Sequence, residues 1–277
     1  MAVSSLASAQ GGASPDAEVA LDEIVVTAQK RAERLQDVPI SVQAVTGEML
    51  QKMGVQNFEN FEVPGVRVSR GGMSDTITVR GIGSGQNLGF EQSAPMYLDG
   101  IYYGRARTQR LGFLDIEQIE LLKGPQPTFL GKNATAGAIN IRTRRPGRDL
   151  EREVEVSYEP ETEEVTAFVA ASVPLNDRWA IRGAARYRDS EGYLTNTITG
   201  RKEPAINDKL ARLTLVGDVT ESTRVTAIGY YAANLDKGRN NQSTICEPNF
   251  RRDTSSAAQD PCLFDDKKAS FSQTPAA

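Results

Sequence analysis

The sequence predicts a small α+β domain followed by the first antiparallel strands of an incomplete transmembrane β-barrel. Two observations lead to this fold class. From Pro39 to about Pro146, short β-prone runs and helical segments alternate with glycine turns, which is typical of a compact α+β domain. After Pro146, apolar and polar residues alternate with a period of two, which indicates strands whose two faces meet unlike surroundings.

The α+β part contains one well-marked helix. It is predicted over Thr46–Met53, because the threonine is a good N-cap and Gly54 can end the helix. A second, shorter helix is expected at Asn57–Glu62, and Asp99-Gly100 is a tight-turn pair between two β-prone runs. The strands expected around these elements are Ile77–Arg80, Pro95–Leu98, Ile116–Leu122 and Ala138–Thr143.

Segment 178–188 carries the clearest strand pattern of the second part. Trp179 and Tyr187 lie on one face of this strand, whereas Arg182 and Arg186 lie on the other. An exposed sandwich strand also alternates, but an apolar face with aromatic ends matches the lipid side of a barrel, and an arginine face suits a wet interior. The segment is therefore interpreted as a barrel strand.

The turns of this second part alternate in length. Those at 174–177 and 218–223 are short, whereas the polar loops at 189–208 and 237–268 are long. Outer-membrane barrels show this asymmetry, with the long loops outside the cell. The other strands with the same pattern are Glu153–Tyr158, Val165–Val173, Leu210–Gly217 and Val225–Asn234, and a possible sixth begins near Ala269.

Composition excludes several classes of function. The net charge of −4 argues against a nucleic-acid binder. The chain has no histidine and only two cysteines, so a zinc site or triad catalysis is not expected, and neither is any cofactor. A phosphate-binding loop also fails, because Gly124 and Gly131 are seven positions apart rather than five and Asn133 follows the lysine. The chain is predicted not to be an enzyme.

Four ordered motifs then identify a family. These are the start EIVVTAQKR, TITVRGIGSG (76–85), APMYLDGIYYGRAR (94–107) and IEQIELLKGPQPTFLGKNATAGAINIRTRRP (116–146). Over about residues 22 to 146 the chain resembles the plug domain of TonB-dependent outer-membrane receptors. The small residues Ala7-Ser8-Ala9 indicate a remnant of a signal peptide at 1–9, with a disordered Ala/Ser leader as the alternative. The resemblance implies a flexible leader with the TonB box at 10–35, a plug domain at 36–148 and a partial barrel of about five to six strands at 149–277.

The resemblance also implies the function and the partners. A receptor of this family binds a scarce solute outside the cell and imports it to the periplasm, using energy from the TonB complex. We therefore expect a TonB-type energy-transducing protein, outer-membrane lipid and a small-molecule ligand such as a ferric chelate as partners, with a ferric siderophore as the default cargo. The expected location is the outer membrane of a Gram-negative bacterium.

Several residues gain roles from the resemblance. The segment Glu23–Thr27 is extended, β-branched and part of a flexible leader, so it can add itself as a strand to a partner. It could also be the first strand of the plug. Where this chain has Pro127 and Lys123, the family usually has glycine and arginine. The TonB-binding residues implied are Glu23, Ile24, Val25, Val26 and Thr27, and the implied plug–barrel contacts are Arg80, Glu120 and Lys123.

Loops of the plug are expected to contact the ligand, although their arginines could instead pair with the barrel wall. Cys246 and Cys262 lie in one long polar loop and are predicted to form a disulfide in an oxidising compartment, with free thiols as the alternative. The predicted ligand-binding residues are Gln86, Asn87, Phe90, Tyr103, Arg105 and Arg107.

Length leads to one further expectation. A full barrel needs several hundred residues at about 10 per strand plus loops, whereas 151–277 supplies 127. The sequence therefore looks like an incomplete fragment of a receptor. The alternative function is that of a free-standing periplasmic plug-like interaction or signalling protein.

Overall fold

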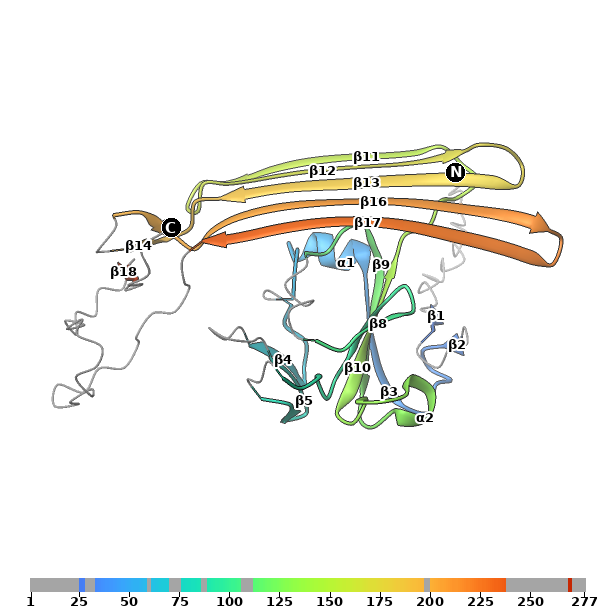
Figure 1. Cartoon of the computed structure of the whole chain (residues 1–277), viewed down its shortest axis with the longest axis horizontal. Helices are drawn as coiled ribbons and strands as arrows, with labels where there is room; N and C mark the ends of the chain where they lie inside the picture. The colour runs from blue at the N-terminus through green and yellow to red at the C-terminus, as the bar shows by residue number, and fades with distance from the viewer. Residues whose placement is uncertain are drawn as a thin grey trace, which may run out of the picture.

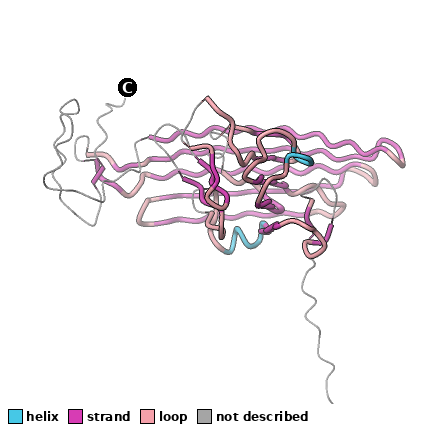
Figure 2. Tube along the Cα trace, turned by 90° about the horizontal axis from the view of Figure 1, so that it is seen from below, coloured by secondary structure: helices cyan, strands magenta, loops and turns pink. Residues whose placement is uncertain are grey.

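The molecule has two parts, a long-strand sheet and an α+β domain that lies against one face of it (Figure 1; Figure 2 shows the same arrangement from below). The computed structural model describes residues 25–27, 33–58, 61–69, 76–85, 89–105, 112–196, 200–237 and 269–270. No helix in these ranges is long and apolar enough to cross a membrane.

A five-stranded sheet in the order β3-β9-β10-β7-β8 forms the centre of the α+β domain. All neighbours in it are antiparallel except β10 and β7, which run parallel. A second, three-stranded sheet in the order β4-β5-β6 lies beside it. The strands are β3 (Ser41–Thr46), β4 (Val66–Ser69), β5 (Thr76–Val79), β6 (Ile82–Gly83), β7 (Met96–Leu98), β8 (Ile101–Tyr103), β9 (Ile116–Lys123) and β10 (Gly137–Thr143).

The predicted first helix is confirmed as α1 (Gly47–Lys52). Its N-cap is Thr46, whose hydroxyl oxygen accepts a hydrogen bond from the main-chain N–H of Met49 at 3.3 Å. Gly54 follows the helix with a φ of +66°, which a glycine adopts without strain. The cap and the stop thus have the positions that the sequence predicts.

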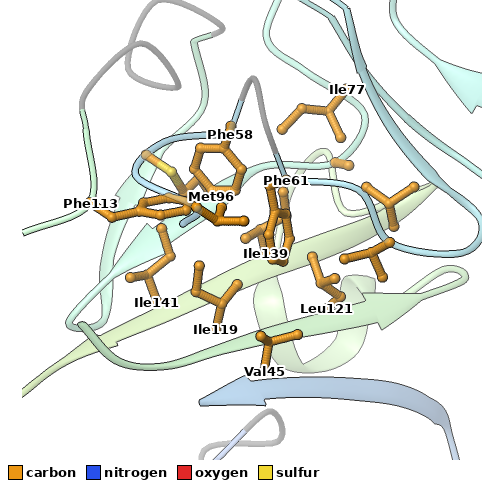
Figure 3. Packing of buried hydrophobic residues seen from close by; sticks show 14 of the residues in the cluster. Val45, Phe58, Phe61, Ile77, Met96, Phe113, Ile119, Leu121, Ile139 and Ile141 are labelled. Atoms are coloured by element: carbon orange, nitrogen blue, oxygen red, sulfur yellow. The ribbon is translucent and has the colours of Figure 1, made fainter. Parts of the chain in front are cut away.

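The second helix, expected at Asn57–Glu62, is wrong for the four of its residues that the structure describes. Phe58 and Phe61 instead turn into the core and meet Phe113 edge to face, with ring centroids 4.8 and 6.1 Å from it. Burial of two large aromatic rings outweighs the weak helical preference of a short segment. The core below them is apolar, with Ile77, Ile119, Leu121 and Ile139 at most 1% exposed (Figure 3).

The glycine and proline turns of the domain also follow the sequence. Asp99 and Gly100 have φ values of +49° and +85°, and they join β7 to β8 as the tight-turn pair predicts. Pro127 opens α2 (Pro127–Leu130), where the missing N–H of proline has no intrahelical partner to lose. The departure of this residue from the family pattern is thus accommodated locally.

The long-strand sheet contains the five strands that alternation predicts. Its order β11-β12-β13-β16-β17 follows the chain, and every neighbouring pair is antiparallel. A strand begins at Ala269 as expected, and this β18 (Ala269–Ser270) pairs with β14 (Leu194–Asn196) rather than with the long-strand sheet. The other strands are β11 (Glu151–Glu159), β12 (Glu164–Pro174), β13 (Trp179–Ser190), β15 (Lys202–Glu203), β16 (Ala205–Thr220) and β17 (Thr223–Lys237).

The two faces of the long-strand sheet differ as predicted. On β13, Arg182 and Arg186 face the α+β domain and are 3% and 7% exposed, whereas Tyr187 on the opposite face is 41% exposed. On β16, Arg212 is 4% exposed and its neighbour Leu213 is 54% exposed. The arginines therefore point to the domain together with a small apolar cluster around Leu210, and exposed apolar side chains such as Leu213 point away from it.

Candidate functional site

The described part of the leader is docked on the α+β domain as a short strand. β1 (Val25–Val26) pairs antiparallel with β2 (Glu33–Arg34). Val26 is 1% exposed and Val25 is 40% exposed, so one side chain is buried against the domain and the next points outward. Of the predicted TonB-binding residues, Val25, Val26 and Thr27 lie in this docked segment, and Glu23 and Ile24 lie outside the described residues.

A buried carboxylate holds the end of this segment. Glu120 is fully buried, and its Oε1 accepts hydrogen bonds from the main-chain N–H of Thr27 at 2.8 Å and from the Thr27 hydroxyl at 3.1 Å. The amide of Asn140, which is opposite Glu120 in the β9–β10 pair, donates to Oε2 at 3.0 Å. Gln118 donates to the main-chain oxygen of Val25 at 3.2 Å. We call Gln118, Glu120 and Asn140 the latch.

The latch gives Glu120 contacts that the family resemblance does not imply. In the described part of the chain its carboxylate bonds only the leader and its own domain, and its contact with a barrel wall stays a prediction. Lys123 likewise donates to Gln43 Oε1 at 2.7 Å and to the main-chain oxygen of Pro64 at 2.6 Å. Arg80 is exposed, and its guanidinium, together with the larger effect of burial, lowers the pKa of Lys123.

The direction of β9 explains why these residues do not meet the long-strand sheet. The strand has eight residues, so at about 3.3 Å per residue its ends lie roughly 25 Å apart. Its first end, next to Asp115, touches the long-strand sheet, and β9 runs away from that sheet toward Lys123 (Figure 1). Contacts with the sheet are therefore made by residues that precede β9.

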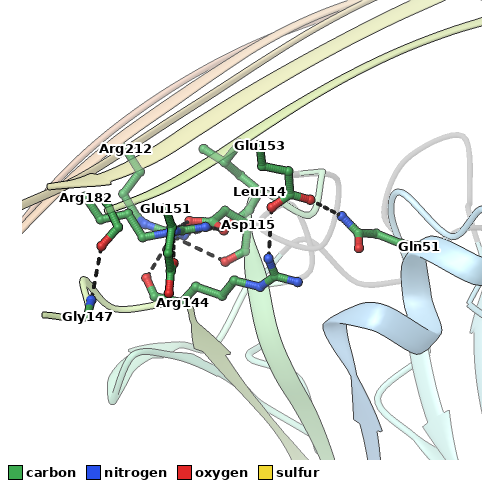
Figure 4. Close-up of polar contacts among 10 residues, drawn as sticks. Gln51, Leu114, Asp115, Arg144, Gly147, Glu151, Glu153, Arg182 and Arg212 are labelled. Carbon is green, nitrogen blue, oxygen red and sulfur yellow. Dashed lines mark hydrogen bonds and ion pairs between the residues drawn. The ribbon is translucent and has the colours of Figure 1, made fainter. Parts of the chain in front are cut away.

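The contact that does join the two parts is centred on Asp115. Its carboxylate is fully buried and accepts two parallel hydrogen bonds from Arg182, one from Nε to Oδ2 and one from Nη2 to Oδ1, both at 2.8 Å. Arg212 donates to Oδ2 at 2.5 Å (Figure 4). One buried anion is thus shared by two buried arginines from neighbouring strands.

Main-chain oxygens extend this contact on both sides of Asp115. Arg212 donates to the carbonyl oxygen of Leu114 at 2.8 Å, and Arg186 donates to that of Phe113 at 2.6 Å. At the rim, Arg144 and Gln51 of the domain both bond Glu153 of β11, at 2.9 and 2.8 Å. Three arginines therefore hold the segment Phe113–Asp115 against the sheet.

Sequence reasoning found only one side of this contact. The arginine face of 178–188 was predicted, but its partner Asp115 was not. The available signal was position: Asp115 is the single acidic residue directly before the buried strand that opens IEQIELLK. A carboxylate next to a fully buried strand needs a partner of opposite charge. The arginines on one face of 178–188 were the candidates for that partner.

The predicted ligand-contacting residues are only partly brought together. Phe90 is 70% exposed and Arg105 is exposed, and a hydrogen bond from the N–H of Gln92 to the oxygen of Gly104 at 2.8 Å holds their loops side by side. Tyr103 instead packs its ring partly against the core. Outside the described residues lie the other predicted ligand-binding residues, Gln86, Asn87 and Arg107, and both cysteines of the predicted disulfide, Cys246 and Cys262.

A polar cluster borders the same loops. Glu91 accepts hydrogen bonds from Lys132 at 3.1 Å and from the Tyr102 hydroxyl at 3.0 Å, and Asn133 also donates to it. The hydrogen bond from Lys132 is the main cause that lowers the pKa of Glu91, followed by that from Tyr102, and the same contact raises the pKa of Lys132. This cluster ties the turn at Gly131 to the loop before β7.

The lowered pKa of Glu91 predicts a pH-dependent opening of this turn. Because the carboxylate is favoured in the folded state, its stabilising effect is present above the ordinary glutamate pKa and is lost as pH falls below it. Hydrogen exchange of peptides covering 131–135 should show more protection in the native chain than in Glu91→Gln at pH 6. The two should converge only as pH falls through the lowered pKa of Glu91, and a difference that does not change with pH throughout the acidic range would contradict the prediction.

Comparison with known proteins gives a family for the α+β domain. Residues 34–138 match the family model described as TonB-dependent Receptor Plug Domain. The pesticin receptor of Yersinia pestis is 32% identical over 128 residues, a match that covers 44% of this chain and 19% of the receptor. The chain thus spans about a fifth of the length of that relative.

Solved structures show the same fold. The ferric yersiniabactin uptake receptor FyuA from Yersinia pestis matches with a TM-score of 0.57 and 24% identity, over 64% of this chain and 29% of that one. The pyoverdine outer membrane receptor FpvA from Pseudomonas aeruginosa PAO1 matches with a TM-score of 0.63 and 18% identity, over 76% of this chain and 30% of that one. Both matches extend beyond the domain into the antiparallel strands, since each covers more of the chain than residues 34–138.

Proposed function

We propose that the chain belongs to the TonB-dependent receptors of the Gram-negative outer membrane, whose plug-domain model matches residues 34–138, and that it serves in capturing a scarce extracellular solute and importing it to the periplasm. The observation that carries this proposal is the docked leader strand beside the family's plug domain. Import then requires force, because the outer membrane holds no ATP. The leader is the segment through which a TonB-type partner would apply that force.

We further propose that the long-strand sheet is the first part of a β-barrel wall around the plug. Its outward face carries exposed apolar side chains such as Val169, Leu213 and Tyr231, as a lipid-facing surface does. Its inward face carries the buried arginines that hold the plug. Among the described residues, β11 and β17 each pair on one side only, and an open edge is not stable in lipid. Further strands must therefore close the wall.

The docked segment has the chemistry that a strand-adding partner needs. Val25 is exposed and β-branched, and a partner strand beside it gains main-chain hydrogen bonds. The latch keeps Thr27 and the oxygen of Val25 occupied, so the partner must compete with Glu120 and Gln118. When TonB binds, the leader would therefore exchange its hydrogen bonds with the latch for hydrogen bonds with the partner strand.

The solute is proposed to be a ferric siderophore. Two of the similar solved structures are named as receptors for ferric yersiniabactin uptake and for pyoverdine. In this chain, the exposed Arg105 and the exposed ring of Phe90 lie on neighbouring loops of the plug. A cation beside an aromatic face suits an anionic, partly apolar chelate.

Replacing Val25 with proline tests the leader's role. Proline removes one main-chain donor and fixes φ, so a partner strand loses at least one hydrogen bond there. The affinity of the full chain for the periplasmic domain of the TonB-type protein from the same organism is expected to fall about tenfold, measured by isothermal titration calorimetry.

Val25→Thr is the matched control, because threonine keeps both the donor and the β-branched shape. Val25 is suited to the test because its side chain points outward, so the change leaves the buried packing of Val26 in place. Equal affinity of the proline variant and the unchanged chain would exclude this segment as the TonB-binding strand.

A further inference from the structure

A cavity lies between the α+β domain and the end of the long-strand sheet that carries β14 (Figure 1). It has a volume of about 480 Å³, which falls within the roughly 300–1,000 Å³ of typical small-molecule sites. Gln56 lines it from the domain, Thr162 from the turn between β11 and β12, and Ser190 from the end of β13. The cavity is therefore large enough for a small solute, and it lies at the end of the sheet where the long loop 189–208 begins.

The register of the strands shows which side chains of the sheet face this space. Thr166 of β12 is 7% exposed and lies opposite Ser157 of β11 and Arg188 of β13. Residues directly opposite in neighbouring strands share a face, as do residues two apart on one strand. The residues that share the domain-facing side of the sheet with Thr166 and line the cavity are Ser157, Glu159, Glu164, Arg188 and Ser190.

The charges in this lining largely cancel. Two carboxylates and one guanidinium line the cavity, which leaves an excess of one negative charge. Glu164 forms an ion pair with Arg188 at 2.8 Å. Glu159 has no ion pair in the described part of the chain, and its Oε1 accepts a hydrogen bond from the main-chain N–H of Glu161 at 3.1 Å. An anionic solute is therefore disfavoured here, because it would lie beside an excess carboxylate.

The other polar groups of the lining are neutral. They are the side-chain amides of Gln56 and Asn57 and the hydroxyls of Ser157, Thr162 and Ser190. The Oε1 atom of Gln56 and the Oγ1 atom of Thr162 are buried and have no hydrogen-bond partner among the described residues, although buried polar groups are rarely left unpaired. Amides and hydroxyls both donate and accept, and so do the hydroxyls of a ligand. The lining thus matches a neutral molecule that carries several hydroxyl groups.

We propose that this space, the sheet-end cavity, binds a free neutral mono- or disaccharide. The amides of Gln56 and Asn57 and the hydroxyls of the lining exchange hydrogen bonds with the sugar, and the carboxylate of Glu159 accepts one from a sugar O–H. A free sugar is favoured over the glycan of a membrane lipid, because the cavity lies on the domain-facing side and the exposed apolar side chains point the other way. Binding requires neither a TonB partner nor a ferric chelate, so the proposal goes beyond the proposed transport function and fails or holds separately from it.

Isothermal titration calorimetry of the full chain with maltose at pH 7 tests the proposal. The chain is kept in a detergent without a sugar headgroup, since such a headgroup would compete for the cavity. We expect saturable binding of one maltose per chain with a Kd of about 1 mM. Glucose, glucosamine and glucuronate then compare a neutral, a cationic and an anionic ring of similar size. Glucuronate should bind about tenfold more weakly than glucose, because its carboxylate meets the excess negative charge.

Two substitutions in the lining locate the bound sugar. Gln56→Leu removes the amide but leaves the main-chain hydrogen bonds of the residue in place, so maltose should bind about fivefold more weakly. Ser157→Leu puts a larger apolar side chain into the cavity from an exposed position on an edge strand, and binding should fall about tenfold. The matched controls Gln36→Leu and Ser222→Leu change exposed residues outside the lining and should bind maltose as the unchanged chain does.

Three results would overturn the proposal. The first is that the unchanged chain binds neither maltose nor glucose saturably. The second is that Ser157→Leu, which changes an exposed side chain and is expected to fold, binds maltose as tightly as Ser222→Leu does. The third is that glucosamine binds more than about tenfold more tightly than glucose, because the cavity would then select a cation rather than a neutral sugar.

Discussion

Asp115→Asn is expected to loosen the plug from the strand sheet and to lower the stability of their contact strongly. Asparagine has almost the same shape, but it leaves Arg182 and Arg212 buried without their shared anion. Removing one partner of a buried ion pair typically costs about 3–5 kcal/mol. Hydrogen exchange at 113–118 should therefore show protection falling by roughly a hundredfold or more.

Asp149→Asn is the control for this prediction. Asp149 is exposed, and the substitution removes the same charge at a site with no ion pair in the described structure. Surface charges contribute little, so protection at 113–118 should stay within a fewfold of the unchanged chain. High salt should not reproduce the effect of Asp115→Asn, because a buried pair is screened only weakly. A loss that salt alone also produces would show that the contact is not buried in solution.

This contact shows where sequence reasoning succeeds and where it stops. The period of two in 178–188 predicted which side chains of β13 face inward, because a strand's alternation is fixed by its own geometry. The partner of those arginines could not be predicted in the same way. Asp115 is 67 residues away from Arg182 in the chain, and only the packing of one part on the other brings them together.

The parts of the fold that could be predicted are those set by residues close together in the sequence. The cap at Thr46 and the Asp99-Gly100 turn depend on a few neighbouring residues, and both have the predicted form. The segment Asn57–Glu62 depends on tertiary packing of Phe58 and Phe61, and its predicted helix is wrong. Local rules hold where local interactions dominate and fail where burial of large side chains decides the conformation.

The contact between Glu120 and the leader could not be predicted, because a family resemblance gives positions but not contacts. The resemblance implies a barrel contact for a carboxylate at this place, and that contact stays a prediction. In the structure Glu120 lies in the middle of β9, opposite Asn140, on the side where the leader docks. A fully buried carboxylate without an ion pair in the described chain needs several donors, and the leader supplies two of them through Thr27.

Release of the leader by Glu120→Ala is the second large effect that the structure predicts, and it rests on the proposed role of the leader. Hydrogen bonds to a charged acceptor contribute about 1.5–3 kcal/mol each, and this change removes both of those that hold Thr27. If the docked form cannot bind TonB, the apparent affinity is the intrinsic affinity multiplied by the fraction of chains that are undocked. Affinity for the periplasmic TonB domain should therefore rise about a hundredfold.

Two further variants separate release of the leader from damage to the plug. Thr27→Val removes the hydroxyl, which donates to Glu120 and accepts from Asn140, but keeps the main-chain N–H that donates to Glu120, so its gain in affinity should be smaller than that of Glu120→Ala. Adding Val25→Pro to Glu120→Ala should reduce the gain from about a hundredfold to about tenfold, because the released strand then lacks a donor for the partner. Hydrogen exchange in β10 reports whether the plug sheet itself stays folded. If Glu120→Ala leaves the affinity for TonB unchanged while β10 stays protected, the latch does not control access to the leader. In that case the docked strand binds its partner as well as the released strand does.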